Sequence, residues 1–498
     1  TDSIPVGYGP VSVRFQDGNT NLVWVVNHIS DTINIVNLAT GLVERTLLTA
    51  DEPADVIFAT AASINSGDPV ALVTCSSLDR IQIWDPGTYT DLGLDIEVTG
   101  EDPRALATNS SMDTVYVAIF ESGNHSTLIR SNEVRNILDT DVTNPYFPNT
   151  FPPYNDGIPG VNWVTPHGSE NFLTIPDTMT DEPGKKLPDA SVIVRNPGNG
   201  TWLDDNGADW AKWISGSSSG LSNRPFGWDM LDNDVSILSD ADGFVGQTFS
   251  TALMNIVMAI AVSPDGSKVV TVGTDATNEI RFEPVINGTF VRVLVSITDA
   301  AGANATIVDM NEAYLDAAQI AQDGGGSTAY HDESVPQGDR DNSIGDPRGV
   351  VFNSAGTRMY VTGMGSNNIV ILDPATGLRT SASQTIEVGE GPTGIVYHAG
   401  NTRLFVLNKF EGSISTIDAT VDSEAFVSTR AFFDPTPLKI KNGRPHLYST
   451  HDNSGLGQIA CASCHIDSRM DRLSWDLGNP VGGVKLTTMA DLFTDPPV

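Results

Sequence analysis

Cysteine is scarce in this 498-residue sequence, which contains only Cys75, Cys461 and Cys464. Long apolar runs are missing as well. No stretch of about eighteen apolar residues occurs, so there is no candidate transmembrane helix and we do not expect the chain to span a membrane. Hydrophobic residues still make up 40% of the sequence, enough for a packed interior. A chain of this length is expected to form two or more units, or one large repeat array.

Basic residues are also few. Lys and Arg total 27 against 62 Asp and Glu, which gives a net charge of −35 and makes nucleic acid a poor partner. The imbalance lies in residues 1–429, because residues 430–498 contain seven basic and seven acidic residues. Such an acidic surface favours solubility in a salty exterior, and it also suits a cationic partner.

Long helical patterns are rare, whereas glycine (46) and proline (29) are abundant, which favours short strands joined by turns. A repeat is visible in which a turn, usually carrying proline, opens an apolar alternating run, and further short strands follow. Six such units begin at Pro10, Pro53, Pro103, Met258, Pro347 and Pro392. Spacings of 45 and 50 residues between neighbouring units indicate β-propeller blades, which bury their sheet faces by stacking in a ring.

We expect an all-β, seven-bladed β-propeller over residues 1–429. The seventh blade is placed in the irregular middle of the chain, where Asp234–Leu238 precedes the turn Ser239–Gly243. Two stretches break the period and are expected to be insertions. One covers about 144–229, is rich in tryptophan and could cap one face; the other covers about 299–346, with a short helix near 310–322.

The repeats resemble the YVTN family of propellers. The resemblance is carried by Val25-Val26-Asn27, by Tyr360-Val361-Thr362-Gly363, and by the strand endings Asn37–Gly41 and Asp373–Gly377. It covers roughly residues 10–420 outside the insertions. It implies the fold and leaves function open, since propellers carry many activities.

Near the end of the chain, Cys461-Ala462-Ser463-Cys464-His465 has the spacing of a c-type haem attachment motif. Positions i and i+3 share one face of a helical turn, so both thiols can form thioethers to one porphyrin while His465 binds the iron as proximal ligand. A redox dithiol would require a thioredoxin-like strand and helix, and a zinc site would need two more nearby ligands. The sequence therefore predicts one covalent haem c, and Cys75 is expected to be a buried, inert thiol.

Residues 443–482, around this motif, resemble the haem-binding part of the di-haem cytochrome c peroxidase and MauG-like group. The resemblance implies a small, mainly helical haem segment at 430–498 and exported, periplasmic or extracellular redox chemistry. It assigns haem attachment to Cys461 and Cys464, the proximal ligand to His465, and an aromatic position near the haem to Trp475. Thr1-Asp2-Ser3 is consistent with a mature N-terminus after removal of a targeting segment.

That group carries two Cys-x-x-Cys-His motifs, and this sequence has one. Our main hypothesis is therefore a c-type cytochrome that passes electrons to a redox partner protein, with the propeller as scaffold or docking platform. A part of a di-haem peroxidase or MauG-like enzyme is the alternative, and a propeller adhesion or assembly module is a further one.

Several ligand questions stay open. His451, ten residues before Cys461, is the first candidate for the distal iron ligand, and Met489 is the next. The haem segment is short, so the propeller, a second subunit of a homo-oligomer or a further domain is expected to cover the haem.

Asp-rich turns at 264–267 and 339–346 could bind Ca²⁺, although ordinary turn chemistry accounts for them.

Overall fold

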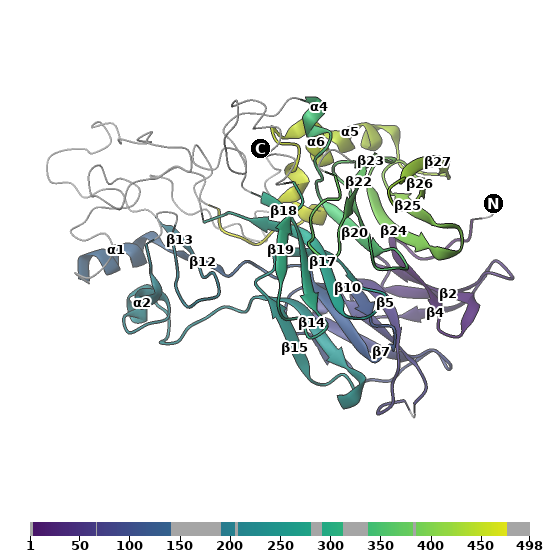
Figure 1. Ribbon diagram of the computed structural model, residues 1–498. Helices are drawn as coiled ribbons and strands as arrows, with labels where there is room; N and C mark the ends of the chain where they lie inside the picture. The colour runs from purple at the N-terminus through teal and green to yellow at the C-terminus, as the bar shows by residue number, and fades with distance from the viewer. Residues whose placement is uncertain are drawn as a thin grey trace. The chain divides into compact units, whose positions relative to one another are not determined.

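The computed structural model describes residues 3–65, 67–140, 191–204, 208–279, 291–311, 337–381 and 385–475 (Figure 1). They divide into two units. The first comprises residues 1–124, 231–276 and 291–472, and the second comprises residues 125–230, 277–290 and 473–498. Each unit is described separately.

The first unit contains five four-stranded antiparallel sheets and one five-stranded antiparallel sheet, which we number as blades in chain order. Blades 1 to 3 are β1 (Pro10–Gln16), β2 (Asn19–Asn27), β3 (Thr32–Asn37) and β4 (Leu42–Leu48); β5 (Pro53–Ala59), β6 (Val70–Cys75), β7 (Arg80–Asp85) and β8 (Thr90–Asp91), with β9 (Ile96–Glu97) also on β7; and β10 (Pro103–Thr108), β11 (Thr114–Ile119), β14 (Asn233–Ser239) and β15 (Gln247–Thr251). Blades 4 to 6 are β16 (Ile256–Val262), β17 (Lys268–Ala276), β18 (Val291–Asp299) and β19 (Thr306–Asp309); β20 (Pro347–Phe352), β21 (Met359–Gly363), β22 (Asn368–Leu372) and β23 (Thr385–Glu387); and β24 (Pro392–His398), β25 (Arg403–Asn408), β26 (Ser413–Asp418) and β27 (Ala425–Ala431).

The first strand of each blade packs on the first strand of the next, from β1 through β5, β10, β16 and β20 to β24. These strands are therefore the inner ones. Apolar side chains from neighbouring sheets interlock between blades, for example Val270 and Val272 of blade 4 with Val350 and Val361 of blade 5. The predicted all-β propeller is confirmed, and the alternating apolar runs are its blade interfaces.

The prediction of seven blades is wrong, because six are present among the described residues. Asp234–Leu238, assigned to a seventh blade, lies in β14, whose Ile237 stands opposite Tyr116 of β11. The chain leaves blade 3 after its second strand and returns to add the third. Ser126–Ile129, the next strand along the chain after β11, forms β12 and pairs with β13 (Val192–Arg195) in the second unit. The first insertion thus splits a blade instead of separating two.

The second predicted insertion, about 299–346, includes a strand of the propeller. Its residues Thr306–Asp309 form β19, the fourth strand of blade 4, which pairs with β18. The helix expected near 310–322 lies almost entirely outside the described residues.

Blades 1 and 6 each leave one face uncovered. On β1, Val13 is 62% exposed and Phe15 is 58% exposed, and on β24 Val396 is 56% exposed. On β5, at the corresponding place in blade 2, every residue except one is buried. Among the described residues, these side chains of blades 1 and 6 therefore have no apolar neighbour that buries them, unlike those of β5.

The second unit has its own core. Beside β12 and β13 it contains α1 (Ser131–Thr140), α2 (Ala211–Ile214) and η2 (Ser219–Ser222). Trp202, Trp210 and Trp213 pack there with Ile129 and Val194, and all five are buried. The described part of the tryptophan-rich insertion thus contributes to a separate apolar core.

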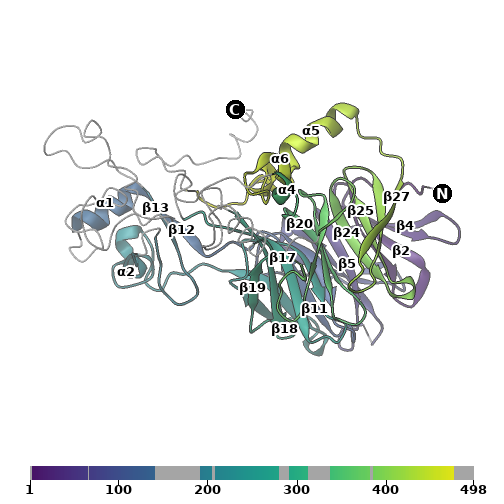
Figure 2. The same cartoon turned by 45° about the horizontal axis from the view of Figure 1, so that its top comes forward.

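After blade 6 the chain forms a mostly helical tail, which we define as residues 432–472. It contains α5 (Leu438–Tyr448), α6 (Thr450–Asn453), η5 (Cys461–Ser463) and η6 (Ile466–Ser468). Its last residues contact the starts of several inner strands, and Figure 2 shows α5 and α6 beside the blades. Among the described residues, no helix is long and apolar enough to cross a membrane.

Candidate functional site

Cys461, Cys464 and His465 lie on one tight turn. The backbone N–H groups of Cys464 and His465 both donate to the carbonyl oxygen of Cys461, at 3.3 and 3.0 Å. The turn is a 3₁₀ turn, in which side chains at i and i+3 lie over one another. The expected common face for the two thiols therefore exists, on a tighter turn than an α-helix provides.

The three side chains differ in exposure. Both cysteines are free thiols; Cys461 is exposed and Cys464 is half-buried. Burial, followed by the charge of Asp471, raises the pKa of the Cys464 thiol to about 12. Redox Cys-x-x-Cys pairs instead have a thiol with a lowered pKa, so the dithiol interpretation gains nothing here. His465 is exposed, and its ring has no hydrogen bond to another described residue. This donor set fits covalent haem attachment.

The residue after His465 anchors the tail to the propeller. Ile466 is 2% exposed and packs with Phe120, which follows β11, and with Ile256 and Met258 of β16. Burying one isoleucine side chain contributes about 2 kcal/mol. One apolar side chain therefore fixes the chain next to His465 on blades 3 and 4.

Two arginines from different blades meet on the next residue. Arg104 of β10 donates to Oδ2 of Asp467 at 2.6 Å, and Arg348 of β20 donates to the same oxygen at 3.0 Å. Although burial alone would raise it, the charges of Arg348 and Arg104 hold the pKa of Asp467 well below its usual range. The guanidinium of Arg104 also stacks on the ring of Phe120, 3.6 Å from its centroid. We call these three charged residues the Asp467 clamp.

Each arginine of the clamp is held by the aspartate two residues before it. Arg104 donates to both carboxylate oxygens of Asp102 at 3.0 and 2.6 Å, and Arg348 donates to those of Asp346 at 2.8 and 3.4 Å. Both sets lie in Asp-Pro-Arg turns that open an inner strand. Bidentate pairing fixes the plane of a guanidinium, so both arginines are oriented before the tail docks.

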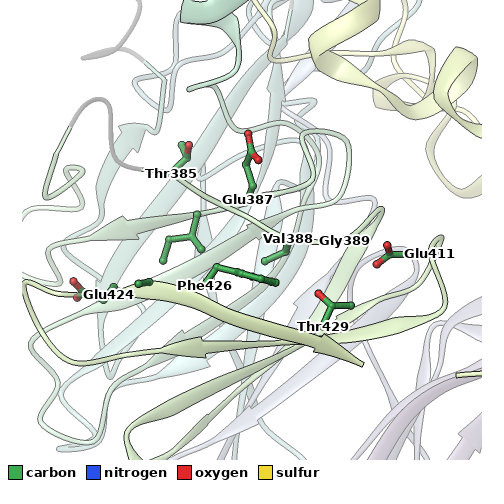
Figure 3. Close-up of a pocket in the computed structure, with 10 residues that line it drawn as sticks. Thr385, Glu387, Val388, Gly389, Glu411, Glu424, Phe426 and Thr429 are labelled. Atoms are coloured by element: carbon green, nitrogen blue, oxygen red, sulfur yellow. The ribbon is translucent and has the colours of Figure 1, made fainter. Parts of the chain in front are cut away.

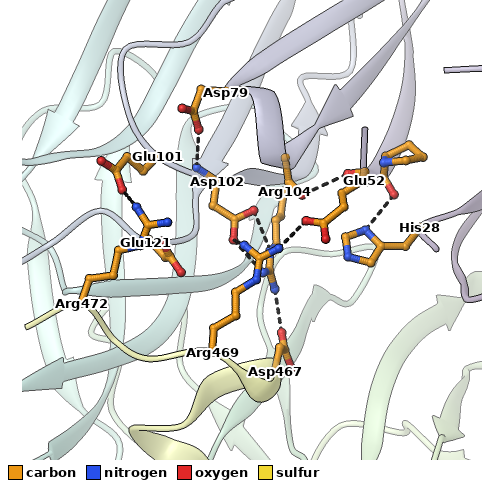
Figure 4. Close-up of polar contacts among 12 residues, drawn as sticks. His28, Glu52, Asp79, Glu101, Asp102, Arg104, Glu121, Asp467, Arg469 and Arg472 are labelled. Carbon is orange, nitrogen blue, oxygen red and sulfur yellow. Dashed lines mark hydrogen bonds and ion pairs between the residues drawn. The ribbon is translucent and has the colours of Figure 1, made fainter. Parts of the chain in front are cut away.

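A second line of ion pairs extends the docking (Figure 4). Arg469 pairs with Glu52, just before β5, and with Asp102 at 3.2 Å. Arg472 pairs with Glu101 and, at 2.7 Å, with Glu121. Burial and the charge of Asp102 nevertheless raise the pKa of Glu121 to about 7, against the lowering effect of nearby arginines. The tail thus meets blades 2, 3 and 5 with complementary charges.

The other predicted ligands are distributed as follows. His451 lies in α6, half-buried, with Nε2 3.2 Å from the carbonyl oxygen of Ser343 and Nδ1 3.8 Å from Asp341. Its ring is therefore engaged with the loop before β20, and its role as distal ligand stays a prediction. Trp475 is half-buried and belongs to the second unit. Met489 lies outside the described residues.

The aspartates of the suggested Ca²⁺ turns have internal partners. Asp265 accepts hydrogen bonds from the hydroxyls of Ser263 and Ser267, and Asp346 binds Arg348. In the described part of the chain, no group of three His, Cys, Asp or Glu residues is placed to hold a metal ion. The suggestion of Ca²⁺ has no support from this geometry.

A groove of about 520 Å³ lies between blades 5 and 6 (Figure 3). Glu387, Glu411 and Glu424 line it together with Ile386 and Phe426. None of its lining residues belongs to the tail, so it forms no part of the Cys-x-x-Cys-His site.

Sequence reasoning missed the clamp. Arg104, Arg348 and Asp467 are far apart in the sequence, and none resembles a ligand. One signal was available: the tripeptide Asp-Pro-Arg occurs twice, each time at the start of an inner strand.

No protein-family model matches the chain, and no curated protein matches it. Among solved structures it is similar to Kuenenia stuttgartiensis hydrazine synthase, with 12% identity, a TM-score of 0.46, and 81% of each chain covered. It is also similar to a chain of the mitotic checkpoint complex, with 10% identity, a TM-score of 0.39, and 87% of this chain and 86% of that chain covered. At such low similarity these structures carry no information about the activity of this protein.

Proposed function

We propose that this protein is an exported c-type cytochrome that carries electrons through one covalently bound haem. The observation that carries the proposal is the turn at Cys461–His465, where two free thiols share a face and an exposed imidazole follows, while the next residues are fixed to the propeller. Cys461 and Cys464 would hold the porphyrin by thioethers and His465 would bind the iron. When bound, the haem supplies one-electron redox chemistry.

The residues of the chain itself have three roles in this function. The tight turn brings the two thiols and the exposed imidazole close together in the chain, Ile466 and Asp467 fix the turn to the inner strands, and the blades supply a rigid base. The acidic surface, with a net charge of −35, would steer a redox partner with a cationic docking face and speed their encounter at low salt. Haem attachment of this type supports a periplasmic or extracellular location. A homo-oligomer could cover the haem.

A part of a di-haem peroxidase or MauG-like enzyme remains the second candidate, supported by the resemblance around the motif. It requires a second haem and an iron with an open coordination position. The propeller adhesion or assembly module is the third, and it predicts self-association that survives loss of both motif cysteines.

The deciding experiment is intact mass together with optical spectra, on protein produced in a host that attaches haem c. The full chain should show the mass of the polypeptide plus one haem and a low-spin spectrum that peroxide does not change. The C461A/C464A variant is the control and should show the mass of the polypeptide alone. A second haem or a peroxide-reactive high-spin signal would favour the enzyme. No covalent haem would overturn the proposal.

A further inference from the structure

The Asp467 clamp has a role beyond fastening the tail. We propose that Arg104 and Arg348 are positioning residues that act through the single carboxylate of Asp467, fix the backbone leaving His465, and so set the orientation in which the His465 imidazole is presented. The docking itself is built into the polypeptide and needs no haem. Only the second readout below rests on the proposed function.

The first step of the argument is that the two arginines are held rigidly. Proline restricts the backbone before each arginine, and each guanidinium uses two nitrogens on its own aspartate. One nitrogen, Nη1, is left on Arg104 and one on Arg348, and both point to the same oxygen of Asp467. The arginine side chains are only 16% and 11% exposed. The carboxylate position is therefore determined by two blades at once.

The second step links that carboxylate to the imidazole. Asp467 is two residues from His465 and has a φ of 49°, in the left-handed region that few non-glycine residues adopt. Around it the chain is closed by backbone hydrogen bonds from Arg469 to Ile466 at 2.8 Å and from Asp471 to Cys464 at 3.1 Å. In so short a closed loop, a shift of the Asp467 side chain has to be absorbed by the dihedral angles beside His465.

The clamp also differs from an ordinary surface ion pair. Arg80 and Asp95 of blade 2 form a one-to-one pair at 3.0 Å, with about a third of each side chain exposed. Such pairs contribute little to stability. In the clamp, two poorly exposed arginines share the carboxylate of Asp467, which lies on a different segment of the chain. Because both arginines bind one oxygen, they fix where that carboxylate lies.

The variants follow from this comparison. D467N removes the carboxylate charge that both arginines share. R104Q and R348Q each remove one of the two ion pairs, and R104K with R348K keeps both positive charges but not the bidentate geometry. R80Q is the matched control at a one-to-one pair. Thermal unfolding of the propeller is recorded for every variant. D467N alters a side chain that is 37% exposed and removes no residue of an inner strand, so it keeps the test available if an arginine variant misfolds.

The first readout uses the C461A/C464A chain without haem. Hydrogen exchange of the backbone amides at 464, 465 and 471, all hydrogen-bonded in the docked tail, should be about ten- to a hundred-fold faster with D467N, as expected for loss of charged hydrogen bonds. R80Q should leave these rates unchanged. Equal rates with and without D467N would overturn the proposal and leave the proposed haem function intact.

The second readout uses the haem-loaded protein. The anisotropy of the low-spin ferric electron paramagnetic resonance spectrum reports the orientation of the axial imidazole, and the midpoint potential reports its bonding. Both should change with D467N and with R104K/R348K, and neither with R80Q. Faster exchange with an unchanged spectrum and potential would make the clamp a structural contact only, and the positioning role would be wrong. If no haem is attached, the proposed function fails, and the exchange data alone decide whether the clamp holds the turn.

Discussion

Ile466 offers the most direct test of how the motif is held. Its side chain is 2% exposed in a cluster whose other members, Phe120, Ile256 and Met258, all belong to blades 3 and 4. Replacing a buried isoleucine by alanine costs about 2–5 kcal/mol in packed cores. The lower bound applies here, because the tail can leave the propeller without unfolding it. About 2 kcal/mol corresponds to roughly a 30-fold increase in the undocked population.

The assay is native-state hydrogen exchange, resolved by residue. In I466A the amides at 464 and 465, which donate to the carbonyl of Cys461, should exchange about 30-fold faster. The amides of β17 in blade 4, paired on both sides with β16 and β18, should not change. I466V should give a smaller effect, about two- to ten-fold, because less volume is lost.

L447A is the matched control, since Leu447 lies in the same tail on α5 but is 40% exposed. It should change neither set of amides. If I466A left the motif amides unchanged, Ile466 would not be the anchor. If motif and β17 amides accelerated together, the tail and the propeller would unfold as one unit and the separation assumed here would be refuted.

Three further predictions concern the rest of the chain. Since burial and Asp102 raise the pKa of Glu121 from 4.5 to about 7, the folded state binds that proton more tightly than the unfolded state, and the free energy of unfolding should fall by at most about 3 kcal/mol as pH rises from 5 to 8. In denaturant titrations E121Q should lose this pH dependence. An equal change of the free energy of unfolding with pH in both proteins would contradict the prediction. G273A should lower stability by about 3 kcal/mol or more, because its Cβ would overlap the backbone carbonyl oxygen of Ile256 in β16. G220A, with open space around its Cβ, should leave stability unchanged, and similar melting temperatures for the two variants would contradict this prediction. Cys75 is fully buried and burial raises its pKa to about 12, so the haem-loaded protein should show no reactive thiol when native and one after unfolding, whereas three after unfolding would mean that no thioether had formed.

The propeller could be predicted from the sequence because its signal is local. Each blade opens with a turn and an alternating run, and the spacing of these turns gives the repeat. The number of blades could not be predicted in the same way. The strands Ser126–Ile129 and Asn233–Ser239 are both short and apolar, and only tertiary pairing decides that the second one joins Thr114–Ile119. An insertion breaks the period in the same way whether it lies inside a blade or between two blades, so the spacing does not tell the two cases apart.

In the candidate site, too, the features that are local in sequence could be predicted and the nonlocal ones could not. The Cys-x-x-Cys-His spacing is contiguous and can be read directly, and the structure gives it the expected common face. The clamp is nonlocal: Arg104 and Arg348 are 244 residues apart and meet only because the inner strands of blades 3 and 5 begin at the same end of the propeller. The repeated Asp-Pro-Arg turn was visible, but the sequence does not reveal what two such turns face.

The tail has a mechanical consequence for the first unit. It leaves blade 6 through β27 and is then fastened to blade 5 by Arg348, to blade 4 by Ile256, to blade 3 by Arg104 and to blade 2 by Glu52. One segment therefore links five blades. Because no strand pair joins blades 1 and 6 among the described residues, such a segment acts as a tie across the blades. A force that spreads the blades apart has to break the ion pair between Arg469 and Glu52 before it can separate blade 2 from the tail that links it to blade 6.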